Sequence, residues 1–118
     1  MIKICLLLLT LSSFGVIASE APSANVYIIS PLNGEEVSSP VAIRFGLSGM
    51  GVAPAGVDKP NTGHHHLLID VDTLPDLTMP VPASANHVHF GGGQTEVMLN
   101  LEPGEHSLQL LMGDKYHI

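Results

Sequence analysis

Residues 41–47 read Val-Ala-Ile-Arg-Phe-Gly-Leu, and this stretch decides the fold. The large apolar residues Val41, Ile43 and Phe45 alternate with residues that are small or charged. Successive side chains of a strand point to opposite faces, so this spacing places the apolar residues on one face. The alternation therefore predicts a β-strand that buries one side in a core.

Other short segments on both sides of this stretch also have strand character. They are residues 25–30, 64–71, 86–90, 96–101 and 106–112. Turn-forming residues separate them, including Pro103-Gly104 and Gly113-Asp114. Several short strands in about 100 residues are typical of a two-sheet domain. We therefore expect an all-β fold, an immunoglobulin-like antiparallel β-sandwich.

The first residues have the composition of an export signal. Lys3 precedes the apolar run 4–11, and small residues follow at 16–19. This order is typical of a secretory signal peptide, and the apolar run is too short for a membrane-spanning helix, which needs about 20 apolar residues. We expect residues 1–19 to be a signal peptide and residues 20–118 to be a single domain that is periplasmic or secreted. Removal of the leader also removes Cys5, so the mature domain has no thiol.

Charge and composition exclude several classes of function. The chain of 118 residues has 11 acidic and 4 basic side chains and a formal net charge of −7. Nucleic acids and anionic membrane surfaces select basic proteins, so neither is an expected partner. None of the serines lies in a nucleophile-elbow context, and no cysteine remains for thiol chemistry. We expect a protein that is not an enzyme.

Histidine is the only residue type in the composition that points to chemistry, with 7 residues. His64 and His66 form one pair with a single residue between them, and His87 and His89 form another. Each pair shares one face of its strand. Neutral imidazoles are good ligands for late first-row metals. The pattern predicts a copper or zinc site formed by these four residues, with Glu96 as an additional oxygen ligand.

The proposed site has further expected properties. Histidine must be neutral to bind a metal, so affinity is expected to fall below about pH 6. His117 is a second optional ligand. His65 falls on the apolar side of its strand and is expected to be a hydrogen-bonded residue at the edge of the core. His106 follows a tight turn and is expected to pack or to bond a backbone carbonyl there.

A second hypothesis gives the histidines a purely structural role. Residues 48–63 are rich in glycine and proline and have no periodicity. Loops of this length in compact domains are usually functional or mobile. In this alternative the chain is a structural or interaction module, and the loop contacts a protein or a glycan.

Three blocks of the sequence resemble a known family. They are residues 44–56, residues 63–70 (Gly-His-His-His-Leu-Leu-Ile-Asp) and residues 87–96 (His-Val-His-Phe-Gly-Gly-Gly-Gln-Thr-Glu). Together with the corner at 101–110, they resemble the bacterial family called domain of unknown function 4399. The resemblance implies an exported domain without an assigned activity, and it supplies no catalytic residues. It also implies a further strand after the Gly-Asp turn, so we expect a chain that is truncated at Ile118 and a sandwich that lacks its last strand.

Overall fold

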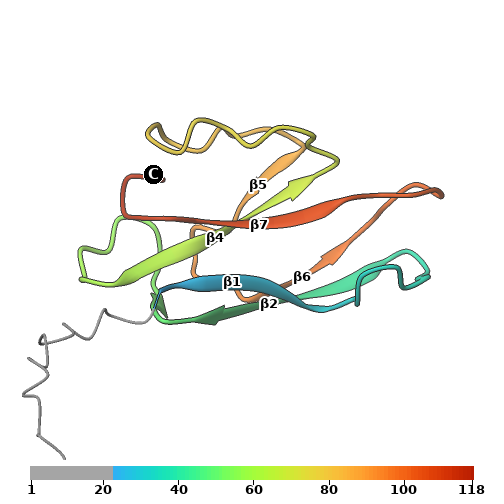
Figure 1. Ribbon diagram of the computed structural model, residues 1–118, viewed down its shortest axis with the longest axis horizontal. Coiled ribbons are helices and arrows are strands. Elements are labelled where there is room, and N and C mark those ends of the chain that lie inside the picture. Colours follow the sequence, from blue (N-terminus) through green and yellow to red (C-terminus); the bar gives the residue numbers. More distant parts are fainter. Residues whose placement is uncertain (1–22) are drawn as a thin grey trace, which may run out of the picture.

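The computed structural model describes residues 23–118, which form strands and no helix (Figure 1). The strands are β1 (Asn25–Ser30), β2 (Val41–Ser48), β3 (Gly51–Val52), β4 (Thr62–Ile69), β5 (His87–His89), β6 (Glu96–Leu99) and β7 (Leu108–Gly113). The predicted signal peptide, residues 1–19, lies outside the described residues. Within residues 23–118 there is no helix with the length and apolar character needed to cross a membrane.

The strands form two sheets that pack face to face (Figure 1). In the first sheet, β2 lies between β1 and β6 and is antiparallel to both. In the second sheet, β4 is the central strand and pairs antiparallel with β5 and β7. These findings confirm the prediction of an all-β sandwich. The short strand β3 pairs parallel with β4. Its residues lie within the segment 48–63, for which the sequence predicts a loop.

The core between the sheets follows the predicted alternation in β2. Ile43 and Phe45 are buried, whereas the intervening Ala42 and Arg44 are exposed. The buried apolar cluster consists of Val41, Ile43, Phe45, Leu67, Ile69, Phe90 and Leu110. Each large apolar side chain contributes about 1.5–3 kcal/mol when it is removed from water. The two central strands, β2 and β4, therefore supply most of the apolar contact that holds the sheets together.

Strand β4 is buried on both of its faces. Leu67 and Ile69 belong to the core, and His65 shares their face. The opposite face carries His64, His66 and Leu68, and these side chains are also almost completely buried. In Figure 1 the long yellow segment after β4 and the chain after β7 pass over this outer face. The structure thus encloses a second buried region outside the apolar core.

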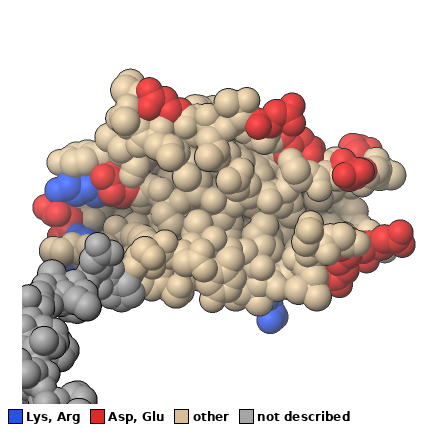
Figure 2. All heavy atoms as spheres, in the orientation of Figure 1, with Lys and Arg blue, Asp and Glu red and all other residues tan. Residues whose placement is uncertain are grey.

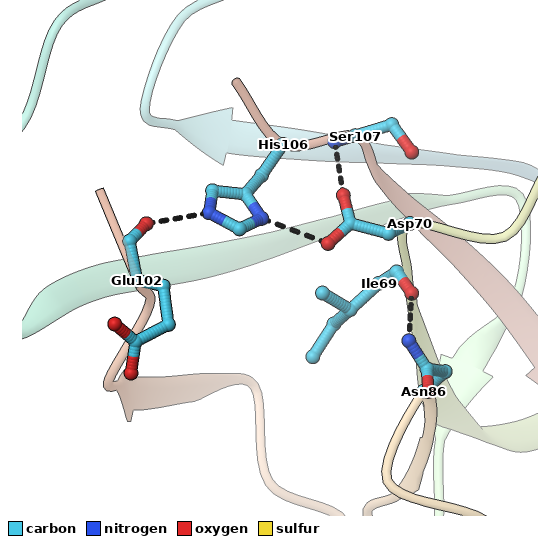
Figure 3. Close-up of polar contacts among 6 residues, drawn as sticks. All are labelled: Ile69, Asp70, Asn86, Glu102, His106 and Ser107. Atoms are coloured by element: carbon cyan, nitrogen blue, oxygen red, sulfur yellow. Dashed lines mark hydrogen bonds and ion pairs between the residues drawn. The ribbon is translucent and has the colours of Figure 1, made fainter. Parts of the chain in front are cut away.

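Strand β4 ends at a polar corner around Asp70 (Figure 3). Asp70 has a left-handed backbone (φ 55), and its carboxylate accepts the Ser107 amide at 2.9 Å. The imidazole of His106 lies 2.8 Å from the other carboxylate oxygen and 2.6 Å from the carbonyl oxygen of Glu102. The expected carbonyl contact of His106 is confirmed. The strand predicted at 64–71 ends at Ile69 because this corner turns the chain away from the sheet.

Candidate metal centre

Histidines from three separate segments converge on the outer face of the second sheet. His64 and His66 come from β4, His89 comes from β5, and His117 follows β7. The register places His66 opposite His89, and it places Gly113 at the end of β7 opposite His64. The chain that leaves β7 therefore begins beside the same part of β4. This is how strand pairing brings residues distant in the sequence to one place.

The ring nitrogens of these histidines lie close together. Nε2 of His89 is 3.1 Å from Nε2 of His64 and 2.9 Å from Nε2 of His117. His64, His66 and His89 each offer a ligand atom, and these three atoms all lie within 4.8 Å of one another. Four nitrogens placed tetrahedrally at 2.0–2.1 Å from zinc are about 3.3–3.4 Å apart. The two Nε2 separations are a few tenths of an ångström shorter than this value, so the cluster has the dimensions of a site for one ion.

Two glycines leave room for the imidazole rings. A Cβ atom at Gly113 would lie 2.6 Å from Cε1 and 3.2 Å from Nδ1 of His66. A Cβ atom at Gly91 would lie 2.9 Å from Nε2 of His89. Any side chain at Gly113 would therefore have to displace the buried His66 ring. The absence of a side chain at these two positions thus provides the space that the His66 and His89 rings occupy.

Several of the buried nitrogens have no hydrogen-bond partner among the described residues. They are Nδ1 of His64 and both ring nitrogens of His66. A buried polar group without a partner costs about 1–3 kcal/mol. The contacts of His89 leave a second deficit. One nitrogen of a neutral imidazole offers either one hydrogen or one lone pair, so Nε2 of His89 cannot form two good hydrogen bonds, with His64 and with His117. Hydrogen bonds among residues 23–118 therefore leave several ring nitrogens of the cluster without a partner.

The environment keeps the buried imidazoles neutral. Burial, followed by the neighbouring His89 and His117, lowers the pKa of His64 to about 4. Burial, followed by the neighbouring histidines, also lowers the pKa of His66 to about 4. The nearby Leu111 backbone opposes this shift, but its geometry is not that of a hydrogen bond. Burial and His117 lower the pKa of His89 as well. Neutral imidazole is the form that binds metals, so these rings are ready to act as ligands near pH 7.

The charge of the protein also favours a cation at this site. The Asp114 carboxylate is close enough to His64 to oppose the lowering of its pKa. The formal net charge of the whole chain is −7, and Figure 2 shows more acidic than basic side chains on the visible face. A negative field raises the local concentration of cations. The negative charge of the protein therefore favours binding of a positive ion. Protonation of the rings is disfavoured by their burial and by the neighbouring imidazoles.

Two of the predicted ligands lie elsewhere. His87 shares a strand with His89, but it is opposite Leu68 in the register, and its Nδ1 contacts the Ser84 hydroxyl at 2.8 Å. Glu96 lies in β6 of the first sheet, where its carboxylate is 3.6 Å from Nε of Arg44. The structure thus brings together three of the five residues expected to bind the metal. The other two make contacts of their own outside the cluster.

His65 and His117 differ from their sequence-based descriptions. His65 is on the core face as expected, but the prediction that it is hydrogen-bonded is wrong. It is fully buried against Phe45, with ring centroids 5.0 Å apart, and neither ring nitrogen has a partner among the described residues. His117, only an optional ligand from the sequence, has its ring centroid 4.6 Å from that of His89. The antiparallel pairing of β7 with β4 brings His117 into the cluster, because β7 ends opposite His64.

The loop proposed as an interaction surface is partly ordered by backbone hydrogen bonds. The amide of Ala53 donates to Gly63 at 2.8 Å, and the amide of Ala55 donates to Gly91 at 2.8 Å. Val57 on the same loop is exposed. A contact between this loop and a protein or glycan stays a prediction, because these hydrogen bonds fix the position of the loop without indicating a partner.

A family model described as a domain of unknown function (DUF4399) matches residues 43–118. This range begins in β2 and includes every histidine of the cluster. No curated protein and no solved structure matches the chain.

Proposed function

The chain belongs to the DUF4399 family of domains of unknown function, and we propose that it binds a divalent transition-metal ion, copper or zinc, through His64, His66 and His89. These three residues are the set whose ligand atoms approach one another within 4.8 Å. The proposal is for a metal-binding module.

One observation carries this proposal. His64 and His66 are only 1% exposed, and three of their four ring nitrogens have no hydrogen-bond partner among the described residues. A structural histidine in a protein interior normally satisfies its ring nitrogens, because an unpaired buried group destabilises the fold. A metal ion would bind one nitrogen of each ring and would offset the cost of burying them together. His65 is also buried without ring-nitrogen partners among the described residues, but it is not one of the three histidines whose ligand atoms approach one another within 4.8 Å. The purely structural hypothesis supplies no comparable compensation for the clustered rings.

The donor set favours copper or zinc over harder ions. All three ligands are imidazoles, which suit zinc, copper, nickel and iron, whereas magnesium and calcium prefer oxygen. The only cysteine of the chain is Cys5, outside the described residues. Copper(II) stands at the top of the first-row affinity series, and zinc readily takes histidine nitrogens in tetrahedral sites. If residues 1–19 direct export as proposed, the module would hold its metal outside the cytoplasm.

Calorimetric titration of the untagged protein with Zn²⁺ and Cu²⁺ tests this function. The informative variant is H89A, because His89 is exposed and its truncation leaves the core intact. The matched control is H87A, which removes the other histidine of the same strand. We expect one ion per chain for the wild type and for H87A with similar affinity. Loss of one of three ligands should weaken binding in H89A by at least about 10–100-fold, the range found for outer-shell partners alone.

Two results would refute the proposal. One is a wild-type dissociation constant weaker than about 100 µM for both ions, which corresponds to a binding free energy of only about 5.5 kcal/mol. The other is H89A that binds as tightly as H87A. Circular dichroism of each variant establishes that the sandwich is folded under the conditions of the titration.

A further inference from the structure

The residues that follow β7 form a compact hook, defined here as Asp114–Ile118. The Asp114 carboxylate accepts the amide of Tyr116 at 2.8 Å and the amide of Ile118 at 3.1 Å. The amide of His117 donates to the Asp114 carbonyl at 2.9 Å. These bonds close the segment on itself and fix the direction in which the His117 side chain leaves the backbone.

The hook holds His117 in an unfavourable backbone conformation and aims its ring at the cluster. His117 has φ 67, in the left-handed region, which costs residues with a Cβ atom roughly 1–2 kcal/mol. Its Nε2 lies 2.9 Å from Nε2 of His89, and its ring centroid lies 4.9 Å from that of His64. Strain of this kind persists where surrounding contacts over-determine the backbone. Here those contacts place one more imidazole beside three others.

The hook also contacts both long loops of the domain. Nζ of Lys115 is 2.9 Å from the carboxylate of Asp58, in the loop between β3 and β4. The amide of Val81, in the segment between β4 and β5, donates to the carbonyl of His117 at 2.7 Å. Two segments that share no strand with one another therefore meet at the hook. The residue that joins the second loop is the same residue that points at the cluster.

The geometry points to His117 as the fourth ligand of the centre, so that metal binding locks the hook and both loops over the outer face of the second sheet. This inference rests on the proposed function. A centre with three protein ligands keeps an open position for water or substrate, whereas four protein ligands close it. With His117 bound, the ion is enclosed by protein, and its binding energy also fixes segments far from β4 in the sequence.

The test compares H117N with the matched control H87N. Asparagine tolerates the left-handed backbone better than other non-glycine residues, so H117N removes the imidazole while keeping the hook. Titration with Zn²⁺ should give H87N the wild-type affinity and H117N an affinity at least about 10-fold weaker. Hydrogen exchange of single amides, followed by NMR with and without Zn²⁺, reports on the loops. In the wild type, zinc should slow exchange of the Val81 and Ile118 amides.

A distant amide provides the internal reference for the exchange experiment. The Ser107 amide donates to Asp70 at the opposite end of β4, so its exchange should change little when zinc binds. In H117N, zinc should no longer slow the Val81 amide. The inference is overturned if H117N binds zinc as tightly as H87N, or if zinc slows the Val81 amide equally in both proteins. Those outcomes leave the three-histidine site standing, whereas absence of zinc binding by the wild type removes both proposals.

Discussion

Substitution of Gly113 by alanine perturbs the proposed centre without removing any ligand. The added methyl group would lie 2.6 Å from Cε1 of His66 and 3.2 Å from the Cα atom of His117. Carbon atoms in contact prefer separations of about 3.5–4.0 Å, so the His66 ring must move by about 1 Å. Because this ring is buried between β4 and the covering segments, it has little free space to enter.

The consequences for stability and for binding can be separated. Overpacking of a well-packed site costs about 1–3 kcal/mol, so G113A should unfold at lower urea concentration than the wild type in the absence of metal. A shift of about 1 Å also moves one ligand nitrogen away from a bond of 2.0–2.1 Å. We expect zinc affinity to fall by about 10–100-fold, similar to the effect of losing an outer-shell partner.

The matched control is G51A, in β3. A Cβ atom at Gly51 would meet its nearest neighbour, Cγ2 of Thr62, at 3.6 Å, which is an ordinary contact. Zinc titration and urea unfolding with and without zinc should therefore show wild-type binding for G51A and weakened binding for G113A. The reasoning is refuted if G113A is folded and binds zinc as tightly as G51A.

Three further predictions concern stability and pH. Replacing His66 by leucine removes two buried nitrogens that have no partner in the described part of the chain; urea unfolding should show a metal-free protein that is more stable by about 1–3 kcal/mol, and any destabilisation would contradict this. Because the pKa values of His64 and His66 are lowered to about 4, protons compete with the metal at these rings only near that pH. Zinc affinity measured from pH 7.5 downward should therefore persist below the pH of about 6 expected from the sequence and should fall steeply only as the pH approaches 4; a tenfold loss already at pH 6 would be inconsistent with this expectation. The bond to Asp70 raises the pKa of His106 from 6.5, and the bond to His106 lowers the pKa of Asp70 from 3.8. The contribution of the His106–Asp70 pair to the free energy of unfolding should be fully present between these two ordinary pKa values. It should fade as pH rises through the raised pKa of His106 and as pH falls through the lowered pKa of Asp70. The difference in unfolding free energy between the wild type and D70N should be largest in that window, and a difference that does not vary with pH would argue against the pair.

The sequence predicts the strands better than their ends. Alternation identifies β2 because Ile43 and Phe45 are large and apolar and their neighbours are small or charged, and this spacing of two is typical of a half-buried strand. It does not identify where β4 stops, because the end depends on the bonds that Asp70 makes with residues more than thirty positions away. Strand β3 is two residues long and lacks any pattern that could be read from the sequence.

The membership of the site depends on register, which one sequence does not contain. The sequence alone predicts that the two pairs of alternating histidines converge as complete pairs. The register places His89 opposite His66 and His87 opposite Leu68, and residues two apart on a strand are separated by about 6.6 Å. His87 therefore lies two residues away from His89 along β5, too far from the cluster to join it. His117 takes its place in the cluster because β7 ends beside the start of β4.

Anomalous diffraction from crystals of the zinc-loaded protein, recorded at the zinc absorption edge, tests the central claim most directly. We predict a single strong peak on the outer face of the second sheet, 2.0–2.1 Å from one ring nitrogen each of His64, His66 and His89. A protein that crystallises from excess zinc with these rings in contact and no anomalous peak between them would contradict the account.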